Sequence, residues 1–121
     1  MDPRHKKRME IVQELFASSY GVPEEKVDET TTQILSQAKE IDLKIDEFAT
    51  THQSDKIAKV DLCILRLAVY ELLYKKDVPV KVIINEAVDL AKEFAGEKSP
   101  GFVNAVLGGV YEKYGASKNK D

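Results

Sequence analysis

The segment from Leu62 to Leu73 is the feature that most constrains the fold of this chain. Its apolar side chains point in almost every direction around a helical axis: Leu62, Cys63, Ile64, Leu65, Leu67, Ala68, Val69, Leu72 and Leu73. A helix that is apolar on all sides is normally enclosed by other helices, and the segment is too long for a buried strand. We therefore expect a central helix that begins at Ser54 or Asp55, the candidate N-cap residues, and ends near Lys76.

Four other segments have the apolar spacing of amphipathic helices. They cover approximately residues 4–20, 29–51, 79–95 and 99–114. Gly96 suits the end of the third of these helices, and Ser99 suits the N-cap of the fourth. Gly108 and Gly109 lie inside the fourth, where close approach of a neighbouring helix would explain both glycines.

Together these segments predict an all-α fold, a compact bundle of about five main helices with a buried central helix. A regular alternation of strands and helices is absent from the pattern, which makes an α/β fold a poor fit. A chain of 121 residues is long enough for one domain, which we expect to span residues 1–121. The folded core is expected at residues 4–114, and a disordered tail at residues 115–121.

The composition narrows the functional class. The formal net charge is -3, so any nucleic-acid site must be local. Cys63 is the sole cysteine, which excludes an intramolecular disulfide and a cysteine zinc site and fits a cytoplasmic protein. His52 and Asp55 are too sparse for a metal site, and we expect no cofactor. No segment approaches the roughly 20 apolar residues of a membrane helix.

A basic cluster opens the first predicted helix. It consists of Arg4, His5, Lys6, Lys7 and Arg8. Cations along a helix can bind the phosphates of a nucleic acid, although cations near a helix N-terminus oppose the macrodipole. A solvated, frayed terminus would have the same composition, so the residues alone leave both interpretations open.

Arg66 is the one cation inside the apolar stretch of the central helix. A charge in that position needs a partner or a route to solvent. Glu86, in the following helix, is the candidate partner. The alternative is that the Arg66 side chain extends along the surface until its guanidinium reaches water.

The stretches ILRLAVYELL, DVP, INEAVDLAK and FVNAVL, all between residues 60 and 110, resemble the C-terminal half of the NusB family of bacterial transcription antitermination factors. Ala105 stands where the family usually has glycine. The connector at residues 21–29 is also short, because many family members carry a helix there.

The resemblance implies an RNA-binding adaptor and no enzymatic activity. Family members bind the boxA sequence of ribosomal RNA leaders through a basic first helix. That role falls on Arg4, Lys6, Lys7 and Arg8 here, although Lys and His replace much of the family's Arg. Lys98 lies in a loop that is near the RNA-binding surface in the family.

The resemblance also implies protein partners. The family pairs with NusE, a small-subunit ribosomal protein, and the positions of Phe16 and Asp61 match the partner surface. The RNA and partner complex would act on the transcription elongation complex. Some family members self-associate, so a homodimer is a further expectation.

Two other functions fit the same fold. One is a protein-protein adaptor that does not bind RNA. The other is a detached regulatory domain of an rRNA methyltransferase, since a NusB-like domain precedes the catalytic module of one such enzyme. The chain has no room for that module and no G-x-G-x-x-G loop.

Overall fold

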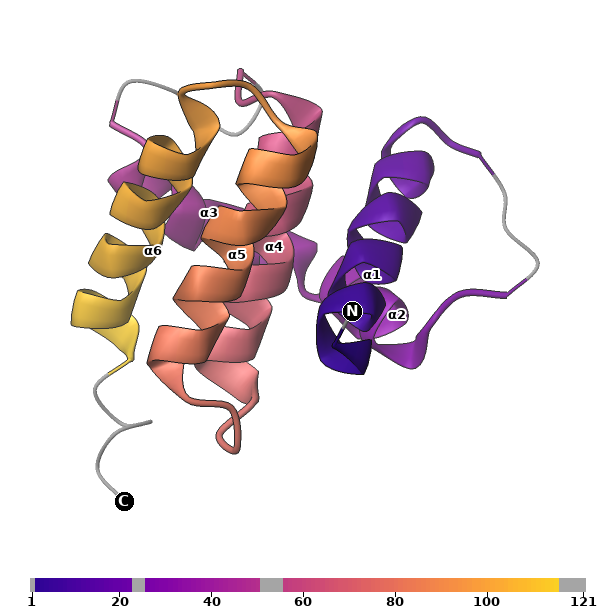
Figure 1. The fold of residues 1–121 in the computed structure, drawn as a ribbon, viewed down its shortest axis with the longest axis horizontal. Helices are drawn as coiled ribbons and strands as arrows, with labels where there is room; N and C mark the ends of the chain where they lie inside the picture. The colour runs from indigo at the N-terminus through magenta and orange to yellow at the C-terminus, as the bar shows by residue number, and fades with distance from the viewer. Residues whose placement is uncertain (1, 23–25, 51–55, 116–121) are drawn as a thin grey trace.

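The computed structural model describes residues 2–22, 26–50 and 56–115, and six α-helices lie in these ranges (Figure 1). They are α1 (Pro3–Ser19), α2 (Glu29–Ser36), α3 (Ala38–Phe48), α4 (Lys59–Tyr74), α5 (Val80–Phe94) and α6 (Ser99–Tyr114). The described ranges contain no strand, and the predicted all-α class is confirmed. None of these helices is long and apolar enough to cross a membrane. The predicted tail lies outside the described residues except for Gly115.

The central helix is α4, as predicted. It contacts each of the other five helices, and in Figure 1 it lies between α1 on one side and α6 on the other. Ile64, Leu65 and Val69 are completely buried within it. Its N-cap is Ala58, and the two predicted cap residues, Ser54 and Asp55, lie outside the described residues. Burial also raises the pKa of the Cys63 thiol to about 11, which makes this residue an unreactive part of the core.

The single helix predicted over residues 29–51 is two helices, and this prediction was wrong. The chain turns at Gln37, and the Ser36 hydroxyl donates to the Gln33 carbonyl at 2.7 Å. Such local bonds compete with the regular helical pattern. The break allows α2 to pack on α1 and α4, while α3 packs on α4 and α6.

Arg66 pairs with Asp42 of α3, and the predicted pairing with Glu86 was wrong. The Arg66 Nε and Nη2 atoms donate to the two Asp42 oxygens at 2.9 Å and 2.7 Å. The carboxylates of Asp42 and Glu86 were equally plausible partners of Arg66 by charge. The difference is geometric, because α3 passes the Arg66 side of α4 and Glu86 is engaged by a histidine of α1.

The two glycines of α6 have different surroundings. A Cβ atom on Gly109 would overlap the ring of Phe48 from α3, whereas one on Gly108 would meet nothing within 4 Å. Close helix approach therefore explains Gly109 and not Gly108.

The different surroundings of Gly108 and Gly109 can be tested with a matched pair of variants. We expect Gly109→Ala to lower the free energy of unfolding by about 1–3 kcal/mol, because the overlap with Phe48 outweighs the better helix propensity of alanine. Gly108→Ala should raise it by up to about 1 kcal/mol. Urea denaturation of both variants measures the difference, and equal effects of the two would contradict this packing.

Candidate nucleic-acid interface

The basic cluster forms the first two turns of α1. The Asp2 carboxylate caps the helix by accepting the backbone N–H of Arg4 at 2.8 Å, and Pro3 occupies the first turn. The turn of the helix then separates the cationic side chains. Arg4, Lys6 and Lys7 are exposed, whereas Arg8 is buried.

Arg8 is held in a two-bonded ion pair with Glu71 of α4. Its Nε and Nη2 atoms donate to the two Glu71 oxygens at 2.9 Å and 2.7 Å, and each side chain is about 10% exposed. The bond to Glu71 raises the pKa of Arg8 above its ordinary value. The sequence carried a signal for this burial, because Arg8 lies in the same helical stripe as Ile11 and Leu15. The RNA contact of Arg8 stays a prediction, and it falls on a side chain that is largely buried and bonded to Glu71.

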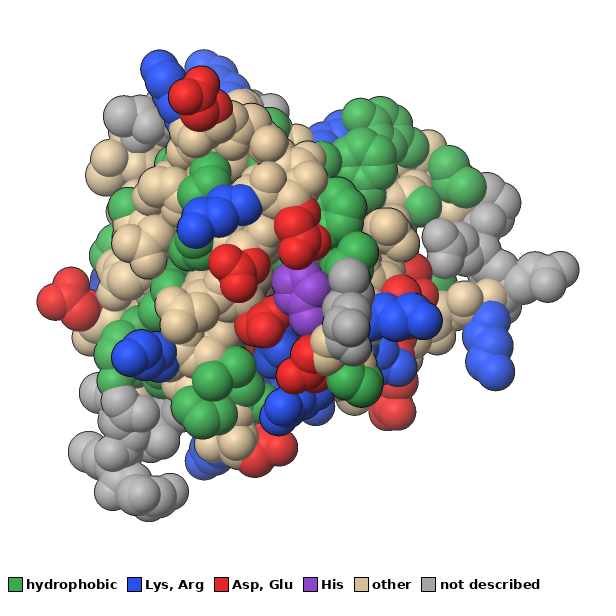
Figure 2. Space-filling model, viewed as in Figure 1, with side chains coloured by type: hydrophobic (Ala, Val, Ile, Leu, Met, Phe, Trp, Pro, Cys, Tyr) green, Lys and Arg blue, Asp and Glu red, His purple; other side chains and the backbone are tan. Residues whose placement is uncertain are grey.

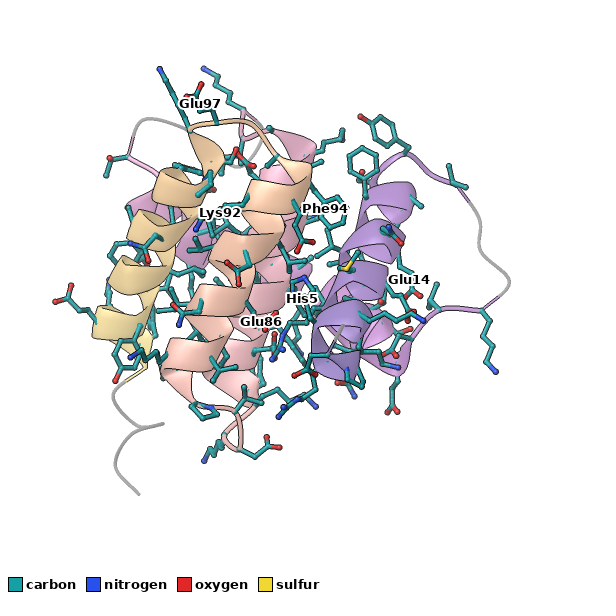
Figure 3. The ribbon with its side chains drawn as sticks, viewed as in Figure 1. His5, Glu14, Glu86, Lys92, Phe94 and Glu97 are labelled. Carbon is teal, nitrogen blue, oxygen red and sulfur yellow. The ribbon has the colours of Figure 1, made fainter. Side chains whose placement is uncertain are left out.

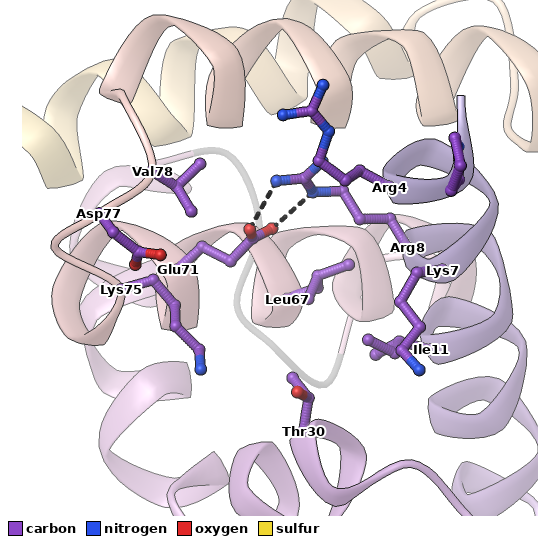
Figure 4. A pocket seen from close by; sticks show the side chains of 11 residues that line it. Arg4, Lys7, Arg8, Ile11, Thr30, Leu67, Glu71, Lys75, Asp77 and Val78 are labelled. Atoms are coloured by element: carbon purple, nitrogen blue, oxygen red, sulfur yellow. Dashed lines mark hydrogen bonds and ion pairs between the residues drawn. The ribbon is translucent and has the colours of Figure 1, made fainter.

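A pocket of about 500 Å³ opens beside this ion pair, between α1, α4, the start of α2 and the α4–α5 loop (Figure 4). Basic side chains border it, and apolar side chains form much of its wall. The basic residues are Arg4, Lys7, Arg8 and Lys75, and the apolar residues include Ile11, Leu67 and Val78. Lys75 did not stand out in the sequence, because it merely follows the end of an apolar helix. This combination suits a ligand with both phosphates and flat apolar rings, such as a nucleotide strand.

The exposed cations differ in their acidic neighbours. Lys7 Nζ lies 2.5 Å from an Asp28 oxygen, and Asp28 also caps α2 by accepting the N–H of Thr30. The bond to Lys7 holds the pKa of Asp28 below its usual value. Within the described ranges the structure shows no ion pair for Lys6. The side chain of Lys6 is thus available to an external anion.

Lys98 does not join this cluster. It is exposed at the N-cap of α6, after the α5–α6 loop. The pocket lies beside the α4–α5 loop, at the other end of α5, which is roughly 22 Å long. Figure 3 shows the separation, since the neighbouring Glu97 lies at one end of the bundle and His5 lies well below it.

Phe16 is half-buried at the far end of α1. It lines a groove of about 220 Å³ with Val60 of α4 and Phe94 of α5. The Tyr20 ring contacts the Phe16 ring edge-on, with ring centroids 5.1 Å apart. Tyr20 is 61% exposed and Phe94 is 40% exposed, and Figure 2 shows hydrophobic side chains gathered over this end of α1. We define Phe16, Tyr20, Val60 and Phe94 as the aromatic patch.

Asp61 points into the protein and not into the aromatic patch. It is 8% exposed, and its Oδ2 atom accepts a hydrogen bond from the Ser99 hydroxyl at 3.0 Å. The predicted N-cap at Ser99 was wrong by one residue, because Lys98 is the N-cap and Ser99 is the first residue of α6. The Oδ1 atom is buried and has no hydrogen-bond partner among the described residues.

Comparisons with known proteins agree on one family. The model of the NusB family matches residues 5–112. The chain is 41% identical over 100 residues to the transcription antitermination protein NusB of Agathobacter rectalis, a match covering 83% of this chain and 76% of that protein. It is also 41% identical over 98 residues to NusB of Bacillus subtilis, covering 78% and 75% of the two chains.

Solved structures extend the similarity to the fold. A crystal structure of NusB from T. maritima superposes with a TM-score of 0.84 at 26% identity, covering 98% of this chain and 96% of that one. A chain from a crystal structure of a plectonemic RNA supercoil has the same fold, with a TM-score of 0.83 at 24% identity. The similarity in fold therefore spans almost the full chain.

The Arg8–Glu71 pair generates a stability prediction. Arg8→Met keeps a long side chain but leaves the buried Glu71 carboxylate without its guanidinium, so we expect the free energy of unfolding to fall by about 3 kcal/mol. The double variant Arg8→Met/Glu71→Met should recover most of that loss, because it removes the buried Glu71 carboxylate together with the guanidinium. Urea denaturation provides the measurement. Arg4→Met is the matched control on the exposed side of α1 and should change stability by less than about 0.5 kcal/mol.

Proposed function

The chain belongs to the NusB family, and on this premise we propose that it is a transcription antitermination factor that binds boxA-like single-stranded RNA. It would bind the RNA of ribosomal RNA leaders together with a NusE-like small-subunit ribosomal protein, in the cytoplasm. The RNA and partner complex would then join the transcription elongation complex. The mechanism is assembly of a complex, and we assign no chemical step to any residue.

The observation that carries the RNA proposal is the grouping of three exposed cations at the start of α1. Arg4 and Lys7 line the pocket, which also has Lys75 on its border, and Lys6 is exposed between them in the chain. A strand whose phosphates contact these cations could direct one base toward the apolar pocket wall. This local grouping is compatible with the net charge of -3, because exposed charges act mainly within about 10 Å at ordinary salt.

Two of the predicted RNA residues receive different roles in this proposal. Arg8 is a positioning residue, because its pairing with Glu71 holds α1 against α4. Lys98 lies at the opposite end of α5 from the pocket, so it would contact only a strand that continues past the cluster. The core RNA site is therefore Arg4, Lys6 and Lys7.

We propose the aromatic patch as the surface for the NusE-like protein. Exposed aromatic side chains around a groove are typical of the centre of a protein-protein interface. Phe16 belongs to the patch directly. For Asp61 we propose an indirect role, in which it fixes the start of α6 next to the patch through Ser99.

The two proposed surfaces lie at opposite ends of α1. Lys6 and Phe16 are ten residues apart on one helix, or roughly 15 Å along its axis. A partner that itself touches RNA could contact the strand while holding the aromatic patch. Each binding event would then raise the effective concentration for the other.

One observation favours the adaptor that binds no RNA. Three cations of the cluster already have acidic partners inside the protein: Arg4 with Asp2, Lys7 with Asp28 and Arg8 with Glu71. In that case the aromatic patch would be the functional surface and the cluster would only stabilise α1.

Salt-dependent RNA binding distinguishes the two functions. Replacing Arg4, Lys6 and Lys7 together with Ala should weaken binding of a boxA-like single-stranded RNA and make the log-log salt slope less negative by about 2, because three phosphate contacts are lost. Fluorescence anisotropy at several salt concentrations, with and without the NusE-like protein, measures both quantities.

The matched control replaces Lys39, Lys44 and Lys113 of α3 and α6, which changes the net charge equally on another face. An equal loss of affinity in both triple variants would mean that binding follows net charge alone. A wild-type protein that binds no RNA at low salt, alone or with the partner, would support the adaptor.

The aromatic patch gives a separate prediction. Tyr20→Ala should weaken binding of the NusE-like protein by more than about tenfold, as expected for an aromatic residue at the centre of an interface. Leu43→Ala on α3 is the control, because Leu43 has the same 61% exposure but lies outside the patch. Isothermal titration calorimetry measures both, and equal affinities of the two variants would refute this location of the partner surface.

A further inference from the structure

The side chain of His5 extends from α1 toward α5, and each of its ring nitrogens contacts a carboxylate of α5. Its Nδ1 atom bonds to Glu86, and its Nε2 atom lies 2.9 Å from an oxygen of Glu93. The side chain is 13% exposed, much less than the cations on either side of it. Figure 3 shows His5 and Glu86 facing one another, and Figure 2 shows acidic side chains along one side of the histidine.

This geometry defines the protonation state of the ring. Carboxylates only accept hydrogen bonds, and a neutral imidazole can donate from only one of its two nitrogens. Both contacts are satisfied only when the ring is the doubly protonated imidazolium. The bond to Glu86 raises the pKa of His5 above its ordinary value, against the opposing effect of burial.

The other charged groups nearby are already paired or point elsewhere. On α1, Arg4 bonds to Asp2, and on the α4 side Arg8 is bonded to Glu71. On α5, Asp89 is exposed and forms no contact with His5. The local balance at the histidine is therefore one cation against Glu86 and Glu93.

We propose that protonated His5 is a positioning residue that clamps the first turn of α1 onto α5, and that it thereby links RNA binding by Arg4, Lys6 and Lys7 to proton binding. This inference rests on the proposed function. His5 lies directly between Arg4 and Lys6 in the chain, so a fixed imidazole ring fixes the backbone that carries both exposed cations.

Loss of the proton acts on RNA binding in two ways. One of the two hydrogen bonds disappears, so the first turn of α1 frays more readily. The cluster of His5, Glu86 and Glu93 also changes from a charge of about -1 to about -2, which repels phosphate. Because the folded-state pKa is raised, the clamp is complete below about pH 6.5 and is lost as the pH rises through the folded-state value. Stability and RNA affinity should both fall in that direction.

The test is the pH dependence of RNA affinity in the full chain, from about pH 6 to about pH 9. His5→Arg keeps a cation that can bridge both carboxylates but does not titrate in this range. His5→Gln removes the charge at every pH. His52→Gln controls for the chain's other histidine and identifies the His5 signal in an NMR titration of the imidazole rings.

We expect the wild-type dissociation constant to rise about fivefold or more across this range, as is typical of coupled binding. His52→Gln should behave like the wild type. For His5→Arg, RNA affinity should be high and independent of pH. For His5→Gln, it should be low and independent of pH. Glu93→Gln should move the loss of affinity to lower pH, whereas Asp89→Asn, with the same change of charge on α5, should not.

Two outcomes would overturn the clamp. One is RNA binding by the wild type with no pH dependence, and the other is an unchanged pH dependence in His5→Arg. Both would leave the proposed RNA function intact. Absence of RNA binding at low salt and low pH would instead refute the proposed function and the clamp together. Thermal melts of each variant at the lowest pH confirm that the comparison is between folded proteins.

Discussion

The pairing of Arg8 with Glu71 determines how the first helix lies on the rest of the bundle. A buried ion pair contributes little net stability, because removing two charges from water offsets most of their attraction. Its two parallel bonds are directional, however, and they specify the rotation of α1 about its own axis. With Arg8 turned inward, Lys6 lies on the opposite side of the helix and Lys7 lies to the side, along the pocket, since successive helical residues are about 100° apart. Arg4, one turn earlier, reaches the edge of the pocket.

The same rotation orients the far end of the helix. Ile11 and Leu15 continue the buried stripe that Arg8 begins, and both contribute to the core. Phe16, next in the chain, is then only half covered and meets Tyr20 at the surface. One orientation of α1 therefore produces a cationic end and an aromatic end. This arrangement provides a physical route by which RNA and a protein partner could bind to one small domain.

The sequence was informative where a pattern had a single structural solution. A helix that is apolar on all sides, such as residues 62–73, has to be central, and α4 is. The sequence was uninformative where several partners were chemically equal. Asp42 and Glu86 were both suitable for Arg66, and only the path of α3 decides between them. Burial of Arg8 was detectable from its helical stripe, but the neighbouring cations concealed it. The clamp on His5 joins residues more than 80 positions apart, and these residues meet only because α1 and α5 both pack on α4.

The acidic partners around the cluster suggest an order in which its cations could bind phosphate. Lys6 forms no ion pair within the described ranges, so phosphate meets no competitor there. At Lys7, phosphate competes with Asp28, but the Lys7 side chain is 57% exposed, and such a surface pair is exchanged at little cost. Asp28 would still cap α2 through Thr30 after that exchange, so α2 would not lose its start. At Arg8 the exchange would leave Glu71 buried without its guanidinium, which is far more costly. Lys6 and Lys7 are thus the cations that can bind phosphate, and Arg8 is the cation that holds the helix in place.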